Sequence, residues 1–196
     1  TKFRKRWRGW LAIPMINFAG AYCGQQRIYP DGSKAHARGS DMSQAHIVIG
    51  DIHSADQLDY VEGFATGSSV YKAHVLAGRN NIAVVVCFDK NGLTRGVKHY
   101  AYLYDSKKHV IRADNDHFKF IEGKGNAGVI AALELAGLLT AKKVKASAPS
   151  FDEFSINDHP TDYNDLEMLG GLRVVAKQLT ARDLRLAPEK NMFLNK

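Results

Sequence analysis

The sequence predicts an α/β fold with a parallel-sheet core, a small basic β-rich subdomain before it and a short helical tail after it. Strand-like and helix-like patterns alternate from Leu58 onward, which is typical of a parallel sheet. The uninterrupted apolar run at residues 82–88 indicates a strand buried on both faces. We therefore expect three regions, at residues 1–57, 58–148 and 149–196.

The first region is predicted to contain a small β unit. Strands are expected at residues 11–16 and 22–29, and the Asn-Phe-Ala-Gly segment at 17–20 suits a hairpin connection. The Pro-Asp-Gly-Ser segment at 30–33 has the composition of a tight turn. One more strand is expected at 46–49, before a polar link leads into the core.

The core is predicted to alternate strands with helices. In chain order these are strand 58–62, helix 66–76, strand 82–88, a helix ending near 104, strand 109–114, helix 129–139 and strand 142–148. This order implies a parallel sheet with right-handed crossovers. A helix near residues 172–179 is expected in the tail.

The composition is that of an ordinary globular protein with a basic character. The 196 residues are 45% hydrophobic and 24% charged, and the formal net charge of +7 suggests a polyanionic partner. Cys23 and Cys87 lie far apart, which argues against a disulfide framework or a cysteine-based zinc site and fits a reducing cytoplasm. No apolar run is long enough to span a bilayer, so we expect no membrane partner. Because the chain begins with Thr1 rather than Met, we expect a fragment of a longer protein.

Four acidic residues follow predicted strands of the core: Glu62, Asp89, Asp114 and Asp116. Loops after parallel strands meet at one edge of the sheet, where α/β folds bind ligands. Asp114 and Asp116 are two residues apart on an extended segment, so both can reach one ion. Carboxylate oxygens suit Mg²⁺ or Mn²⁺, and Glu62, with its pKa raised by neighbouring carboxylates, can act as a general base or acid.

Each of these acids, taken alone, is also compatible with a solvated loop, because an aspartate after a strand is ordinary turn chemistry. It is their occurrence after three successive core strands that favours a shared site. Dinucleotide-binding and Walker-type sites are disfavoured, because the sequence has neither the G-x-G-x-x-G spacing after the first core strand nor the motif G-x-x-x-x-G-K.

Basic side chains are concentrated before the core. The first ten residues interleave five of them with Phe3, Trp7 and Trp10, so cations can neutralise phosphates while the rings stack on bases. A linker whose tryptophans dock on the domain is the alternative. The candidate nucleic-acid-binding residues are Arg4, Arg6, Arg8, Arg27 and Lys34.

Several segments resemble the Toprim domain, and in particular its phage and plasmid primase branch. VEGFATGS at residues 61–68 resembles the glutamate motif, and IRADND at 111–116 resembles the D-x-D motif. NAG at 126–128 and DYND at 162–165 resemble later motifs of the same branch, the second with Tyr163 in place of Phe. Residues 11–40 resemble the β unit that precedes Toprim in primases, with Arg27 and Lys34 at the family's basic positions.

The resemblance implies the catalytic fragment of a DNA primase from a plasmid, phage or other mobile element. Such a fragment makes RNA primers by metal-dependent nucleotidyl transfer, with single-stranded DNA and nucleoside triphosphates as partners and a replicative helicase as a further candidate. Glu62, Asp114 and Asp116 would be catalytic, and these three with Asp89 would hold Mg²⁺ or Mn²⁺. The alternatives are a Toprim nuclease or topoisomerase that cleaves phosphodiesters, and a non-catalytic module that binds single-stranded DNA.

Overall fold

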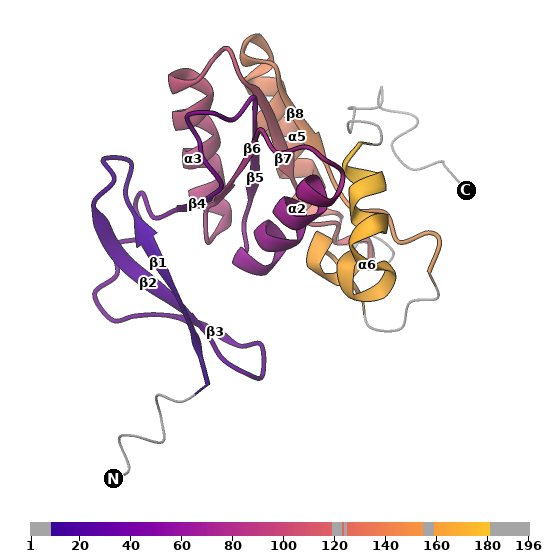
Figure 1. Ribbon diagram of the computed structural model, residues 1–196, viewed down its shortest axis with the longest axis horizontal. Coiled ribbons are helices and arrows are strands. Elements are labelled where there is room, and N and C mark those ends of the chain that lie inside the picture. The colour runs from indigo at the N-terminus through magenta and orange to yellow at the C-terminus, as the bar shows by residue number, and fades with distance from the viewer. Residues whose placement is uncertain (1–8, 119–122, 124, 155–158, 181–196) are drawn as a thin grey trace.

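The computed structural model describes residues 9–118, 123, 125–154 and 159–180. Within these residues the chain forms a three-stranded N-terminal sheet and a five-stranded core sheet. Figure 1 shows the N-terminal sheet beside the core, with helices on both faces of the core sheet. None of the described helices has the length and apolar character needed to cross a bilayer.

The N-terminal sheet is antiparallel and consists of β1 (Leu11–Ile16), β2 (Tyr22–Ile28) and β3 (Lys34–His36). The predicted hairpin connection is confirmed, because the Asn17 side chain accepts hydrogen bonds from the amides of both Ala19 and Ala21. The predicted turn at residues 30–33 leads into β3, a third strand that the sequence analysis did not anticipate.

The core sheet has the strand order β4-β6-β5-β7-β8. The predicted parallel arrangement is confirmed for β5 (Gln57–Val61), β6 (Ile82–Val86), β7 (Lys108–Arg112) and β8 (Val144–Ser147). The strand expected at residues 46–49 forms as β4 (Ile47–Ile49), but it pairs antiparallel with β6 in the core sheet instead of joining the N-terminal unit. All five residues of β6 are buried, and β4 supplies its second neighbour.

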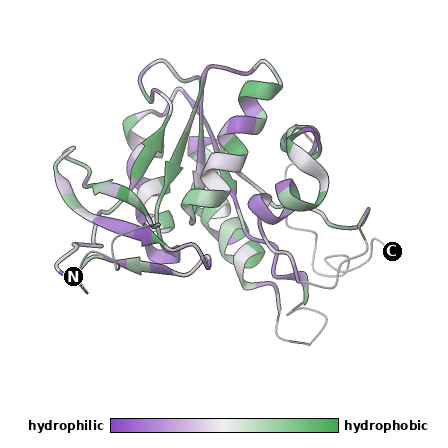
Figure 2. Ribbon diagram, turned by 60° about the horizontal axis from the view of Figure 1, so that its bottom comes forward, coloured by the Kyte–Doolittle hydropathy of each residue, from purple (hydrophilic) through white to green (hydrophobic). Residues whose placement is uncertain are grey.

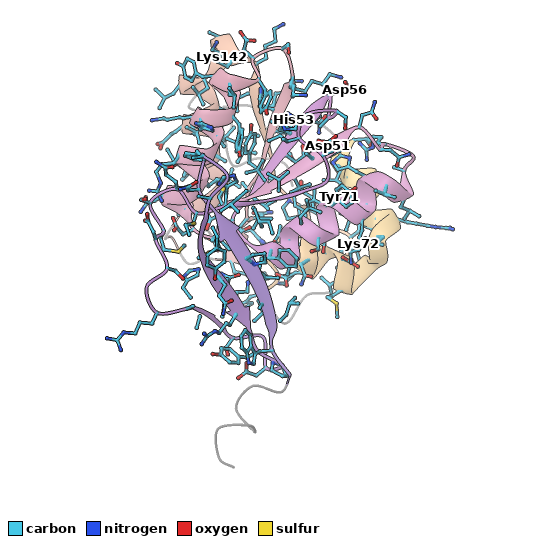
Figure 3. All side chains as sticks on the ribbon, turned by 60° about the vertical axis from the view of Figure 1, so that its left-hand side comes forward. Asp51, His53, Asp56, Tyr71, Lys72 and Lys142 are labelled. Atoms are coloured by element: carbon cyan, nitrogen blue, oxygen red, sulfur yellow. The ribbon has the colours of Figure 1, made fainter. Side chains whose placement is uncertain are left out.

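Two helices cover each face of the core sheet. Helices α2 (Phe64–Leu76) and α6 (Tyr163–Leu179) pack on one face, and α3 (Lys90–Leu103) and α5 (Ala127–Leu138) pack on the other. Figure 2 shows the strands between these layers as predominantly hydrophobic. Lys72 of α2 pairs with Glu167 of α6 at 2.6 Å, and Figure 3 shows Lys72 at the side of α2 that adjoins α6.

Helix α6 begins earlier than the helix predicted near Leu172. Asp162 caps its first turn by accepting hydrogen bonds from the amides of Asn164 and Asp165, in a capping box. Gly171 has a φ of 76° and interrupts the helical backbone. The Gly-Gly pair at residues 170–171 interrupts the helical pattern of hydrophobic residues. The sequence therefore predicted only the second half of α6, near residues 172–179.

Candidate active site

The four predicted acids lie at the carboxyl edge of the core sheet. Glu62 directly follows β5, Asp89 follows β6, and Asp114 and Asp116 follow β7. Because these three strands are parallel and adjacent, their carboxyl ends share one edge. The structure therefore gathers these residues at the edge where the sequence placed them.

Asp114 is the most perturbed carboxyl group at this edge. Burial and the negative charges of Asp162, Glu62 and Asp116 raise its pKa to about 7, and the positive charge of Lys34 opposes this shift. A carboxylate among like charges is costly to ionise. At Asp114, burial and like charges therefore outweigh the opposing charge of Lys34.

Glu62 belongs to the same electrostatic cluster. Burial raises its pKa, the charge of Lys90 opposes that shift, and the charges of Asp89 and Asp116 raise the pKa further. A glutamate whose pKa lies above its ordinary value is better matched to proton transfer near neutral pH. The predicted direction of this shift is confirmed.

Two asparagines hold the segment that carries Asp114 and Asp116. The Asn115 amide donates to the carbonyl of Thr161 at 2.6 Å, and the Asn115 side chain donates to the carbonyl of Pro149 at 2.7 Å. The Asn126 side chain donates to the Asn115 side chain at 2.7 Å and accepts from the amide of Asp116 at 3.1 Å. The loop between the two acids is therefore tied to α5 and to the segment before α6.

Gly128, in the first turn of α5, allows that helix to approach the acidic loop. A Cβ at this position would lie 2.5 Å from the carbonyl oxygen of Asp114, which no side chain can accept without a backbone shift. The glycine-containing segment at 126–128 thus sets the approach of α5 to the acidic edge.

Asp89 has a structural role in addition to its charge. Its side chain accepts a hydrogen bond from the amide of Gly92 at 2.6 Å and so caps α3. Phe88, immediately before it, has a φ of 64°, a left-handed conformation that is unfavourable for a bulky residue. The turn after β6 therefore places Asp89 and Lys90 beside Glu62 through a strained backbone.

Lys34 joins the N-terminal sheet to this edge. A Cβ added at Gly63 would lie 3.7 Å from the Lys34 ammonium nitrogen, so the Lys34 side chain reaches the turn that follows Glu62. The guanidinium of Arg27 instead lies over the ring of Trp10, at 4.9 Å from its centroid. The structure thus places one of the two predicted basic residues of this sheet at the acidic edge, and pairs the other with an aromatic ring.

Asp162 is the site residue whose part the sequence analysis missed. It is the first among the charged groups that raise the pKa of Asp114, and its Oδ2 accepts a hydrogen bond from the Thr66 hydroxyl at 2.7 Å. The segment DYND was noticed for its resemblance to a later primase motif, without a role. The capping-box spacing of Asp162 and Asp165 is the signal that marks a helix start here.

The opposite edge of the sheet also carries acids, but their environment differs. Figure 3 labels Asp51, His53 and Asp56 there, in the connection between β4 and β5. Asp51 accepts from the amide of His53 at 2.9 Å, and Asp56 accepts from the Asn81 side chain at 3.2 Å. These acids stabilise turns, so the acidic cluster is specific to the carboxyl edge.

The donor atoms at the carboxyl edge fit a divalent cation by their chemistry. Within the described ranges, no three His, Cys, Asp or Glu side chains converge closely enough to hold an ion between them. Mg²⁺ commonly takes only one or two carboxylates and completes its coordination with water and substrate phosphates. Carboxylate oxygens that raise one another's pKa suit such an ion. Because no three of these side chains converge among the described residues, the Mg²⁺ or Mn²⁺ assignment stays a prediction.

The predicted basic arm cannot be placed. Arg4, Arg6 and Arg8 lie outside the described residues. Their assignment to nucleic-acid binding therefore stays a prediction as well.

Comparison with known proteins supports the fold. No protein-family model matches the chain, and no curated protein matches it. A similar chain occurs in a solved structure of the bacteriophage T7 lagging-strand DNA polymerase interacting with primase domains of two gp4 subunits bound to an RNA/DNA hybrid and dTTP. The TM-score is 0.54 at 13% sequence identity, over 86% of this chain and 76% of that chain. The similarity is to the gp4 primase domain, so the fold is primase-like.

Proposed function

We propose that this protein is the Toprim-type catalytic fragment of a DNA primase, of the kind carried by phages, plasmids and other mobile elements. It would make RNA primers on single-stranded DNA by nucleotidyl transfer. The observation that carries the proposal is the acidic cluster at the carboxyl edge, joined by Lys34 from a basic sheet, in a primase-like fold. The similar chain belongs to a structure whose primase domains bind an RNA/DNA hybrid and dTTP, which supports nucleic acid and nucleotide as partners.

Asp114 and Asp116 would hold Mg²⁺ or Mn²⁺. Glu62 is near enough to interact electrostatically with both. A bound divalent ion neutralises substrate phosphates and stabilises the charge that develops during in-line displacement. Asp89 contributes charge beside Glu62 while it caps α3.

The protein's own side chains would then orient the substrates and move the proton. Glu62, with its raised pKa, would accept the proton of the attacking hydroxyl. Lys34 would contact a phosphate of the incoming nucleotide, since its ammonium group reaches the turn beside Glu62. Arg27 and the basic arm, with Arg4, Arg6 and Arg8, would follow the template strand through phosphate contacts.

Primer synthesis on single-stranded DNA with Mg²⁺ tests this function directly. Wild-type protein should incorporate ribonucleotides, whereas Glu62→Gln should bind DNA with unchanged affinity and incorporate none. Cleavage of the DNA by wild type but not by Glu62→Gln would instead indicate a Toprim nuclease. If wild type binds DNA but neither makes primers nor cleaves the DNA, and Glu62→Gln binds with the same affinity, the chain is a binding module.

A salt series measured by fluorescence anisotropy tests the template path. Replacing Arg4, Arg6 and Arg8 with Ala should weaken single-stranded DNA binding and flatten its dependence on salt, because fewer counterions are released. Metal affinity should stay nearly unaltered, since exposed charges are screened beyond about 8 Å at physiological salt. Equal DNA affinity of variant and wild type at every salt concentration would exclude the arm from the template path.

A further inference from the structure

A network of hydrogen-bonded polar side chains lies within the core, next to the strand ends that carry the acids. At its centre is Asp59, in the middle of β5, whose side chain is fully buried. Its Oδ2 accepts a hydrogen bond from Nε of Arg112 at 2.8 Å and lies 2.7 Å from Nε2 of His74. Its Oδ1 accepts from the side chain of Gln57 at 2.7 Å. One carboxylate thus connects β5, β7 and α2.

The chain of contacts continues to the start of α6. Nη1 of Arg112 donates to the hydroxyl of Ser147 at 2.7 Å, and that hydroxyl lies 3.1 Å from the hydroxyl of Tyr163. Arg112 ends β7, Ser147 ends β8, and Tyr163 is the first residue of α6. Arg112, Ser147 and Tyr163 are each at most 4% exposed, so the contacts among these three residues are shielded from water.

Two members of this network adjoin acids of the candidate site in the sequence. Arg112 precedes Asp114 by two residues, and Tyr163 directly follows Asp162. Asp162 is in addition held by the Thr66 hydroxyl, from the first turn of α2. The backbone segments that carry Asp114 and Asp162 are therefore joined through rigid buried contacts, although 48 residues separate them in the sequence (162 − 114).

Stability alone does not account well for such a network. Burying an ion pair incurs a desolvation cost that its attraction often only offsets, and well-packed apolar residues are frequently as stable. A hydrogen-bonded network does, however, define one geometry, because each donor has a fixed direction and distance. This property is useful where like-charged groups must be held close to one another.

We propose that Arg112, Ser147 and Tyr163 are positioning residues, which hold the acidic groups of Asp114 and Asp162 in the arrangement that the candidate site needs. The inference rests on the proposed function for its kinetic readout. It goes beyond that function because it states that buried side chains, which touch neither substrate nor metal, affect the reaction rate by positioning the acids.

Tyr163→Phe and Tyr60→Phe form a matched pair for the test. Each removes one hydroxyl from a fully buried tyrosine and keeps the ring. The Tyr60 hydroxyl lies 2.7 Å from Nδ1 of His109, on the α3 and α5 side of the sheet, away from the network. Ser147→Ala is a second variant, which breaks the network by the loss of a single oxygen atom.

Three measurements are made on wild type and all three variants: thermal unfolding, steady-state primer synthesis with Mg²⁺, and Mn²⁺ titration followed by electron paramagnetic resonance. Tyr163→Phe and Ser147→Ala should lower kcat about tenfold with KM for nucleotide unchanged, because small displacements of reacting groups are costly. They should weaken Mn²⁺ binding about tenfold as well, as loss of groups that orient metal ligands does. Tyr60→Phe should match wild type in both readouts.

The inference is overturned if the two network variants keep wild-type kcat and Mn²⁺ affinity, or if Tyr60→Phe loses as much as they do. The second outcome would mean that any lost buried hydrogen bond has this effect. If wild type makes no primers, the proposed function fails, whereas the Mn²⁺ titration still decides whether the network positions the acids.

Discussion

Asp59 lies in β5, and Asp114 follows the adjacent strand β7. The pKa values of these two buried carboxyl groups are shifted in opposite directions. Burial raises the pKa of Asp59, but the charges of Arg112 and His74 and their hydrogen bonds outweigh it and hold the pKa at about 2. Burial also raises the pKa of Asp114, and there three more carboxylates raise it further, to about 7. The sign of the neighbouring charges, and not burial, separates the two residues.

The difference separates a carboxylate that is paired within the fold from one that lies among like charges. Asp59 has its partners built into the fold, so it needs nothing from solution. Lys34 opposes the raised pKa of Asp114 and Lys90 opposes that of Glu62, but burial and the like charges outweigh both cations. Such a cluster stores unfavourable energy that a bound cation can relieve.

The same substitution should have opposite effects at the two positions, and this is the largest expected difference. Asp59→Asn leaves the buried guanidinium of Arg112 without its counter-charge, which should cost about 3–5 kcal/mol of unfolding free energy. Asp114→Asn removes repulsion and should leave the protein equally or more stable at pH 8. Urea denaturation of both variants beside wild type measures the contrast. Equal destabilisation by the two changes would refute the view that partner charge separates them.

The contribution of Asp114 to the stability of the metal-free protein should fall as pH rises from about 4 to 7. In this window folded Asp114 still holds the proton that the unfolded chain, with a pKa near 3.8, has already released, so folding is increasingly disfavoured. The loss from this one group is on the order of 4 kcal/mol. Asp59 acts in a different window, since its contribution is lost only as pH falls from about 4 towards 2.

Urea denaturation from pH 4 to 8, in the presence of a chelator, tests this dependence with Asp114→Asn as the matched control. The difference in unfolding free energy between variant and wild type should grow with pH across that range. A difference that is constant with pH would mean that Asp114 has an ordinary pKa.

Mg²⁺ or Mn²⁺ should reverse part of that loss. A ligand present at ten times its dissociation constant stabilises the folded state by about 1.4 kcal/mol. At pH 8 the wild-type melting temperature should therefore rise with the cation, whereas an Asp114→Asn, Asp116→Asn double variant should not respond. An equal rise in both proteins would remove these two residues from the metal site.

Lys34 should have the smallest of these effects. Its positive charge lowers the pKa of Asp114, so Lys34→Met should raise that pKa above about 7, by less than about 1 kcal/mol in equivalent free energy. NMR titration of the Asp114 carboxyl group measures the shift. Arg27→Met, which removes a cation held over Trp10, is the control and should leave the Asp114 titration unchanged.

The sequence alone predicted the parallel strands of the core and the positions of the acids Glu62, Asp89, Asp114 and Asp116. Both follow from local patterns, because apolar runs specify buried strands and the carboxyl ends of parallel strands necessarily share one edge. It likewise determined the hairpin after β1 and the turn before β3, which depend on the conformational preferences of a few neighbouring residues.

The contacts between charged groups depend on the tertiary structure. Lys34 approaches Gly63 from another sheet, Asp162 comes to Asp114 from the tail, and β4 pairs with β6 in the core. Asp59 and Arg112 are 53 residues apart, and no local pattern marks them as partners. Side-chain pairing across such separations depends on how the layers pack. Whether the pKa of a buried carboxylate is lowered or raised therefore depends on packing and not on its immediate neighbours in the chain.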